Sequence, residues 1–285
     1  MTPAAAAAPI GVFDSGLGGL SVVREMRRQL PGERIVYAGD SIHAPYGARG
    51  EDEIRRLSLG LAGFLVERVG CRGLVIACNT ATAAAAETVR AAFPNVPVVG
   101  MEPAVKPAVA VTRTGVVGIL ATVGTLASAR FAALLERYGG TVEFVTQPCP
   151  GLPEAVERGE LDTPGTRALV GKYVAPLLAR GADTLVLGCT HYPVLRPLIA
   201  EIAGPNVALI DTGEAVARRA ASLFGFGTAC ENGEPTALTL YTTAPDAAVF
   251  ARGAQVILGC AAPPLVCRLV WKNGELIPHG EDAPH

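Results

Sequence analysis

Short runs of β-branched and other apolar residues alternate along the chain with longer stretches rich in Ala, Leu and Arg. The short runs are hydrophobic almost throughout, which is typical of parallel strands buried on both faces. The predicted strands are residues 10–13, 34–38, 73–77, 96–100, 116–120, 142–146, 184–187 and 207–210, and the predicted helices include 19–30, 51–69, 82–93, 128–138 and 166–180. This alternation predicts a doubly wound α/β fold, whose functional sites lie beyond the carboxyl ends of the strands.

One segment of the chain is repeated. Residues 74–82 read LVIACNTAT and residues 185–193 read LVLGCTHYP, and each is an apolar strand that ends in a cysteine and a polar residue. The stretches IGVFDSGLGGLSV and VGILATVGTLAS precede the two copies at nearly equal spacing. Reuse of strand–turn–helix units is common in α/β proteins, but the shared polar residue at the strand end favours a true duplication. We therefore expect two similar parallel-sheet domains related by a pseudo-twofold axis, with the active site between them.

The repeat places Cys78 and Cys189 at equivalent strand ends, each before a predicted helix. The free N–H groups and the dipole at a helix N-terminus favour the thiolate over the thiol. Two thiols that face a bound molecule from opposite sides could remove a proton from one face and deliver a proton to the other. This pattern predicts inversion of a stereocentre, with one sulfur as thiolate and the other as thiol in each direction.

Three other interpretations of the cysteines compete with this one. Zinc could bind Cys78, Cys189 and His191, although no CxxC motif supports such a site. A cysteine hydrolase would require Cys189 and His191 to meet, and side chains two positions apart at a helix start usually diverge. Buried structural cysteines would leave the polar residues after each cysteine unexplained. We expect the remaining cysteines to be small buried hydrophobic residues, namely Cys71, Cys149, Cys230, Cys260 and Cys267.

Bulk properties narrow the class of protein. The 285 residues are 50% hydrophobic with a formal net charge of -2, so no basic surface for nucleic acid is indicated. The chain has neither a long uncharged apolar run nor a secretory signal, and its scattered cysteines suit a reducing cytosol. Its three lysines, Lys106, Lys172 and Lys272, have no Gly-rich phosphate loop beside them, which argues against pyridoxal phosphate.

Two turns add candidate binding groups. DSGLGG, residues 14–19, follows the first strand and could expose backbone N–H groups to a carboxylate, but it lacks the spacing of a dinucleotide-binding loop. APYG, residues 44–47, is a turn in which Tyr46 offers a phenolic donor.

Taken together, these motifs resemble the glutamate racemases of bacterial cell-wall synthesis. The resemblance runs from about residue 10 to 259 and rests on VFDSGLGGLSV, GDSIHAPYG, VIACNTAT, ILATVGT, CPGLPEAVERGEL and LGCTHYPVL, in that order. It implies a cofactor-independent, metal-free isomerase that interconverts L- and D-glutamate in the cytoplasm and supplies D-glutamate for peptidoglycan. It also implies a homodimer with no membrane or direct nucleic-acid contact, and it leaves open a contact with DNA gyrase for which the sequence shows no surface.

The resemblance also assigns roles to residues of this chain. Cys78 would act on the D-enantiomer and Cys189 on the L-enantiomer, with Asp14 assisting the first and His191 and Glu157 the second. The implied substrate contacts are Asp14, Ser15, Asn79, Thr80, Thr190 and His191 for the α-substituents, and Tyr46, Gly47 and Thr122 for the side-chain carboxylate. The chain departs from the family at His43 and Ala44, where a basic residue is common nearby, and at Gly151, Pro153 and Glu154, where an apolar run is usual.

The predicted organisation is a disordered leader (1–9), a discontinuous first domain (10–99 with 212–270), a second domain (100–211) and a tail (271–285). Rival functions are an aspartate racemase or a maleate- or hydantoin-type isomerase of the same superfamily, and a binding protein with weak catalysis.

Overall fold

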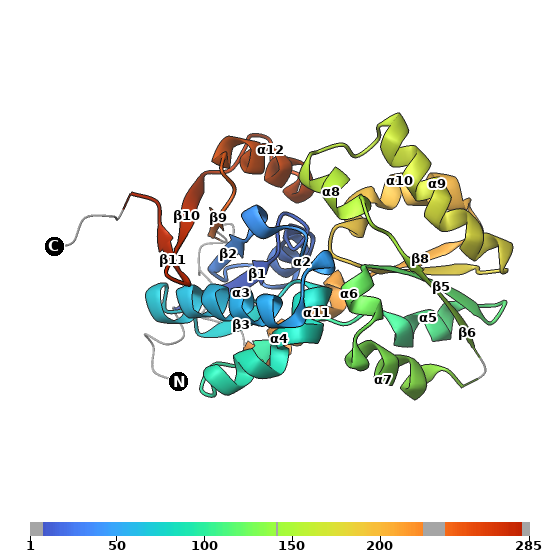
Figure 1. Ribbon diagram of the computed structural model, residues 1–285, viewed down its shortest axis with the longest axis horizontal. Coiled ribbons are helices and arrows are strands. Elements are labelled where there is room, and N and C mark those ends of the chain that lie inside the picture. Colours follow the sequence, from blue (N-terminus) through green and yellow to red (C-terminus); the bar gives the residue numbers. More distant parts are fainter. Residues whose placement is uncertain (1–7, 141, 225–236, 281–285) are drawn as a thin grey trace.

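The computed structural model describes residues 8–140, 142–224 and 237–280. Two sheets flanked by helices lie side by side, one built from both ends of the chain and one from its middle (Figure 1). This confirms the predicted α/β fold with two parallel-sheet domains. The exact domain limits stay a prediction.

The first sheet has the strand order β11-β10-β9-β2-β1-β3-β4. Its predicted strands form as β1 (Ile10–Asp14), β2 (Ile35–Gly39), β3 (Gly73–Ile76) and β4 (Val98–Val99), all paired in parallel. Every residue of these four strands is buried, because helices cover both faces of the sheet.

The second sheet has the order β6-β5-β7-β8 and is also parallel. Its strands are β5 (Val116–Ala121), β6 (Glu143–Pro148), β7 (Thr184–Gly188) and β8 (Ala208–Ile210). The order matches that of β2-β1-β3-β4 when each half is counted from its own first strand. The shared order supports the duplication read from the sequence.

Two hydrophobic cores flank each sheet. In the first half, α2 (Leu20–Gln29), α11 (Gly213–Phe224) and α12 (Ala247–Leu258) cover one face, and α3 (Glu51–Gly63) with α4 (Asn79–Ala92) covers the other. A π-helical turn, η3 (Phe64–Arg68), extends α3. In the second half, α8 (Leu152–Glu157), α9 (Pro164–Ala179) and α10 (Arg196–Ala203) pack opposite α5 (Val105–Val111) and α7 (Ala129–Tyr138). Short helical elements complete the chain: α6 (Val123–Leu126), η1 (Ser41–His43), η2 (Tyr46–Ala48) and η4 (Tyr192–Leu195).

Three strands of the first sheet were not predicted. They are β9 (Leu238–Thr242), which pairs in parallel with β2, then β10 (Val266–Lys272) and its antiparallel neighbour β11 (Glu275–Pro278). Residues 271–272 and 275–278, predicted to lie in a tail, therefore lie in strands of this sheet. Asn273 and Gly274 both have positive φ and turn the chain between β10 and β11, so the Asn-Gly pair was a usable hairpin signal.

The other cysteines differ in exposure. Cys71 and Cys149 are buried as predicted, whereas Cys260 is half-buried and Cys267 is exposed. The prediction was wrong for the last two because Cys260 lies just beyond the end of α12 and Cys267 lies on β10 near the sheet edge. Cys230 lies outside the described residues. Across the described ranges, no helix has the length and apolarity needed to cross a bilayer.

Candidate functional site

Cys78 is positioned by the junction between β3 and α4. It caps α4, and its sulfur accepts a hydrogen bond from the backbone N–H of Ala81 at 3.4 Å. On its other side it lies 3.9 Å from Oγ of Ser15, which in turn lies 3.4 Å from Oδ1 of Asp14. Both Ser15 and Asp14 come from the end of β1, so neighbouring strand ends place one carboxylate and one hydroxyl beside this sulfur.

The ionisation of Cys78 differs from the sequence-based expectation. Burial and the nearby Asp14 carboxylate raise the pKa of Cys78 well above its ordinary value, and the Ala81 N–H lowers it less. Cys78 is therefore a thiol at neutral pH, because desolvation outweighs the helix N-terminus. Burial also raises the pKa of Asp14, although His191 and the Gly19 N–H, which donates at 2.7 Å, act against that rise.

Cys189 follows β7 in the second half and has a different partner. Its sulfur lies 3.5 Å from Nδ1 of His191, so the expectation that these side chains diverge was wrong. The reason is local geometry: the chain bends and turns after Cys189 and enters η4 at Tyr192, and the regular helix α10 begins only at Arg196.

Glu157 completes this arrangement. Its Oε1 lies 2.6 Å from Nε2 of His191 and accepts a hydrogen bond from the Leu17 N–H at 2.6 Å. His191 is 1% exposed. Burial alone would lower the pKa of His191, but its contacts with Cys189 and Glu157 together raise the pKa well above the ordinary value. The imidazole is therefore a buried cation held between a sulfur and a carboxylate.

Two glycines let the halves of the molecule approach each other. A Cβ on Gly16 would lie 2.0 Å from Oε1 of Glu157, and a Cβ on Gly18 would lie 2.7 Å from both Nδ1 of His191 and Oγ1 of Thr190. Ser21 adds a hydrogen bond from its Oγ to the Thr190 carbonyl at 3.1 Å. The DSGLGG loop therefore packs directly against the Cys189 turn.

Hydroxyl groups join the halves on the Cys78 side. Oγ1 of Thr80 lies 2.9 Å from Oγ1 of Thr122 and 3.3 Å from that of Thr125. Asn79 is 4% exposed, and neither its amide nitrogen nor its amide oxygen has a partner among the described residues. A buried amide without partners is costly and points to a ligand or solvent that it would bind.

The Tyr46 turn is built differently from the expectation. Tyr46 is 1% exposed, and its phenol donates to Oδ2 of Asp40 at 2.8 Å, so the hydroxyl is already used. Gly47 packs on Thr122, since a Cβ there would lie 2.7 Å from the Thr122 Cβ. Asp40 was not singled out from the sequence, although it directly follows the last residue of β2, at the same edge of the sheet where Asp14 ends β1.

The two sulfurs belong to one electrostatic cluster. Cys189 contributes to the raised pKa of Cys78, and His191 and Glu157 both act on Asp14. The arrangement brings together two sulfurs from opposite halves, each with its own acid–base neighbours. Such a cluster can take a proton from a small molecule and return one to it.

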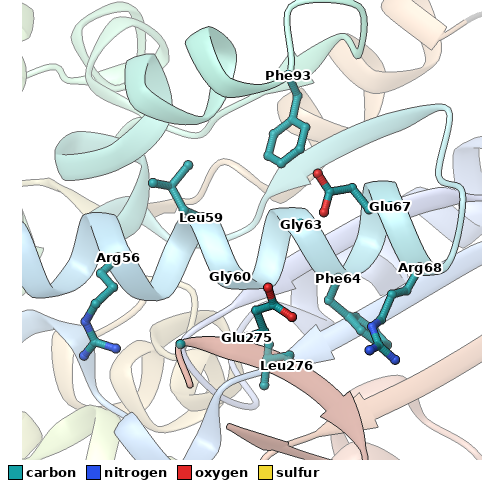
Figure 2. Close-up of a pocket in the computed structure, with 11 residues that line it drawn as sticks. Arg56, Leu59, Gly60, Gly63, Phe64, Glu67, Arg68, Phe93, Glu275 and Leu276 are labelled. Carbon is teal, nitrogen blue, oxygen red and sulfur yellow. The ribbon is translucent and has the colours of Figure 1, made fainter. Parts of the chain in front are cut away.

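No group of three or more His, Cys, Asp or Glu in the described part of the chain is arranged to hold a metal ion. A cavity of about 530 Å³ lies elsewhere, between α3 with η3 and the β10–β11 hairpin (Figure 2). None of its lining residues is a predicted site residue.

The chain is similar to known proteins over most of its length. The family described as Asp/Glu/Hydantoin racemase matches residues 10–220. A glutamate racemase from Pseudomonas entomophila is 54% identical over 240 residues, which cover 84% of this chain and 90% of that protein.

Solved structures give the same result. A glutamate racemase isoform, RacE1, from Bacillus anthracis superposes with a TM-score of 0.80 at 34% identity, covering 91% of this chain and 96% of that one. The Escherichia coli glutamate racemase in complex with L-glutamate and the activator UDP-MurNAc-Ala superposes with a TM-score of 0.80 at 30% identity, covering 94% and 99%.

Proposed function

Because the chain belongs to the Asp/Glu/Hydantoin racemase family, we propose that it interconverts L- and D-glutamate by proton transfer at Cα between Cys78 and Cys189. The observation that carries this proposal is the pair of sulfurs at equivalent strand ends of the two halves, in different acid–base surroundings. Glutamate racemases to which this chain is similar, one of them solved in complex with L-glutamate, support glutamate as the substrate.

The proposed reaction assigns each proton to an atom. From the L side, Cys189 acts as a thiolate paired with the His191 imidazolium and takes the α-proton. Cys78, held as a thiol by burial and Asp14, gives its proton to the opposite face of the carbanion-like carbon. The reverse reaction uses the same groups in exchanged roles, and exchange with solvent returns each sulfur to its starting protonation state.

The surroundings of Cα must stabilise negative charge, because the α-proton is far less acidic than a thiol. We propose that Ser15, Asn79, Thr80 and Thr190 bind the α-amino and α-carboxylate groups. The unpartnered amide of Asn79 supports this assignment. Asp14, His191 and Glu157 then tune the two sulfurs, and the carboxylates of Asp14 and Glu157 attract the ammonium group.

For the side-chain carboxylate we propose Thr122 and the Tyr46–Gly47 turn. Since the Tyr46 phenol donates to Asp40, the turn would bind through its backbone N–H groups rather than through that hydroxyl. Supply of D-glutamate for peptidoglycan, a cytoplasmic location, a homodimeric state and the absence of a cofactor remain part of this proposal. Among the residues that the structure describes, no contact favours a gyrase-binding role.

The test follows deuterium entering Cα when the protein is incubated with L-glutamate in D2O, with a chelator and without pyridoxal phosphate. Wild-type protein should racemise glutamate and label the product. Cys78→Ala should lose racemisation yet still exchange the α-proton of L-glutamate through Cys189, and Cys189→Ala should do the same with D-glutamate only.

Cys267→Ala is the matched control, because this exposed cysteine lies on β10, outside the cluster. It should racemise at the wild-type rate. Full racemisation by Cys78→Ala would refute the two-thiol mechanism. Activity on aspartate or hydantoins but not on glutamate would replace the proposed substrate.

A further inference from the structure

A buried carboxylate beside the proposed site gathers hydrogen bonds from several elements. Asp40 is 0% exposed and directly follows β2. Its Oδ1 accepts from Oγ1 of Thr243 and from Nε1 of Trp271, each at 2.8 Å, and its Oδ2 accepts from the Tyr46 phenol at 2.8 Å. Nδ1 of His43 lies 2.9 Å from Oδ2. Donors directed at one charged acceptor form the stronger kind of hydrogen bond and fix one another's geometry.

These donors connect the Tyr46 turn to the C-terminal strands. Thr243 follows β9, and its Oγ1 also accepts from the Ile42 N–H at 3.0 Å. Trp271 lies on β10. The hydrogen bonds of Asp40 thus connect the segment from η1 to η2 with residues in or next to the C-terminal strands, more than 200 positions away along the sequence.

Trp271 is itself held firmly. Its ring lies against Gly60 of α3, where an added Cβ would come within 2.5 Å of two ring carbons. It also meets the His43 ring edge to face, with centroids 5.8 Å apart. Figure 2 shows the hairpin strand that carries Glu275 and Leu276 running beside α3 at Gly60.

We propose that Asp40 is a positioning residue for recognition of the substrate's side-chain carboxylate, an inference that rests on the proposed function. Asp40 fixes the Tyr46 ring, and the ring fixes the backbone of the Tyr46–Gly47 turn against Thr122. Because Trp271 donates to Asp40, the β10–β11 hairpin also affects affinity for the substrate, although it contributes no group to the proton transfer.

A role in folding alone makes a different prediction. If Asp40 only stabilised the fold, its loss would lower the melting temperature while the protein that stays folded kept its KM. A positioning role predicts a rise in KM with kcat little changed. Among the described residues, the hydrogen bonds of the Asp40 side chain go to Tyr46, Thr243, Trp271 and His43, and not to the sulfurs or to the side chains beside them. The backbone N–H of Asp40 does donate to the Asp14 carbonyl at 3.0 Å, but Asp40→Asn keeps that bond.

The experiment measures kcat, KM and melting temperature for glutamate racemisation by four proteins. These are the wild type, Asp40→Asn, Trp271→Phe and the control Asp183→Asn. Asp183 is a suitable control because it accepts from Thr112, Thr184 and two backbone N–H groups, yet it precedes β7, at the end of the strand opposite to Cys189.

Asp40→Asn should raise KM about tenfold or more with kcat within about threefold, the effect of losing one hydrogen bond to a charged acceptor. Trp271→Phe keeps an aromatic ring at this position and removes one of the donors to Asp40 while the Tyr46 donor stays, so KM should rise by a smaller factor, about threefold. Asp183→Asn should lower the melting temperature and leave KM unchanged.

Trp271→Phe keeps the test decisive if Asp40→Asn does not fold. Unchanged KM in the folded Asp40 and Trp271 variants overturns this inference, and so does an equal rise in KM in Asp183→Asn. A wild type that is inactive on glutamate overturns the proposed function together with this inference, whereas an active wild type with unaffected variants overturns this inference alone.

Discussion

The close contact between the DSGLGG loop and the Cys189 turn gives a sharp mutational test at Gly18. A Cβ there would lie 2.7 Å from Nδ1 of His191, 2.7 Å from Oγ1 of Thr190 and 2.8 Å from the backbone nitrogen of His191. Gly18 does not have a positive φ, so Gly18→Ala acts through this clash alone. Rotation of side chains cannot relieve a contact with a backbone atom.

The size of the effect follows from these distances. Unstrained contacts with carbon are roughly 3.5 Å long, so the two halves must separate by roughly 0.7 Å. A misplacement of about 1 Å costs about a hundredfold in rate, so kcat/KM should fall about 10- to 100-fold. The same overpacking should lower the free energy of unfolding by about 1–3 kcal/mol.

Racemisation kinetics and urea unfolding of Gly18→Ala check both numbers. Gly171→Ala is the matched control, because Gly171 lies inside α9 with nothing within 4 Å of an added Cβ. That control should keep its activity and gain about 0.5–1 kcal/mol from the better helix former. A Gly18→Ala enzyme with kcat/KM within twofold of wild type would refute the reasoning.

Three further outcomes are expected. Glu157→Gln removes a charge that helps raise the pKa of His191. The resulting loss of stability should be largest below about pH 6.5 and should vanish as the pH rises through the raised pKa of His191 in the folded protein. Urea unfolding at several pH values checks this. Iodoacetamide at neutral pH should modify the exposed Cys267 at least about tenfold faster than Cys78, whose pKa is raised, as measured by peptide mass spectrometry. Glu33→Gln removes the carboxylate that lies 2.8 Å from Arg72, whose side chain is 7% exposed. The variant should lower the free energy of unfolding by about 3–5 kcal/mol, measured in urea, with kcat unchanged.

The sequence was most informative where structure is local. The buried strands of both halves and their cysteine-ending junctions are visible because strand hydrophobicity and the following polar residue lie within a few positions. β9 and β10 were missed because they are stabilised by pairing in a sheet whose other strands lie far away in the sequence: β9 pairs with β2, and β10 pairs with β9.

The same reason limits prediction of the site. The contact between Cys189 and His191 depends on a turn that delays the helix, and sequence spacing suggested the opposite. The thiol state of Cys78 depends on burial, which the helix-end argument left out. The Tyr46 phenol was assigned to a ligand because its acceptor, Asp40, shows its importance only through Thr243 and Trp271.

The two sulfurs have unequal surroundings, Ser15 and Asp14 for one and His191 and Glu157 for the other. Mirror-image amino acids have equal free energies, so an enzyme that interconverts them must have the same kcat/KM in both directions. The asymmetry can therefore appear only in the way kcat and KM are divided for each enantiomer. After the duplication, the residues around each sulfur could therefore change independently. No such change could shift the equilibrium ratio of the two enantiomers away from one.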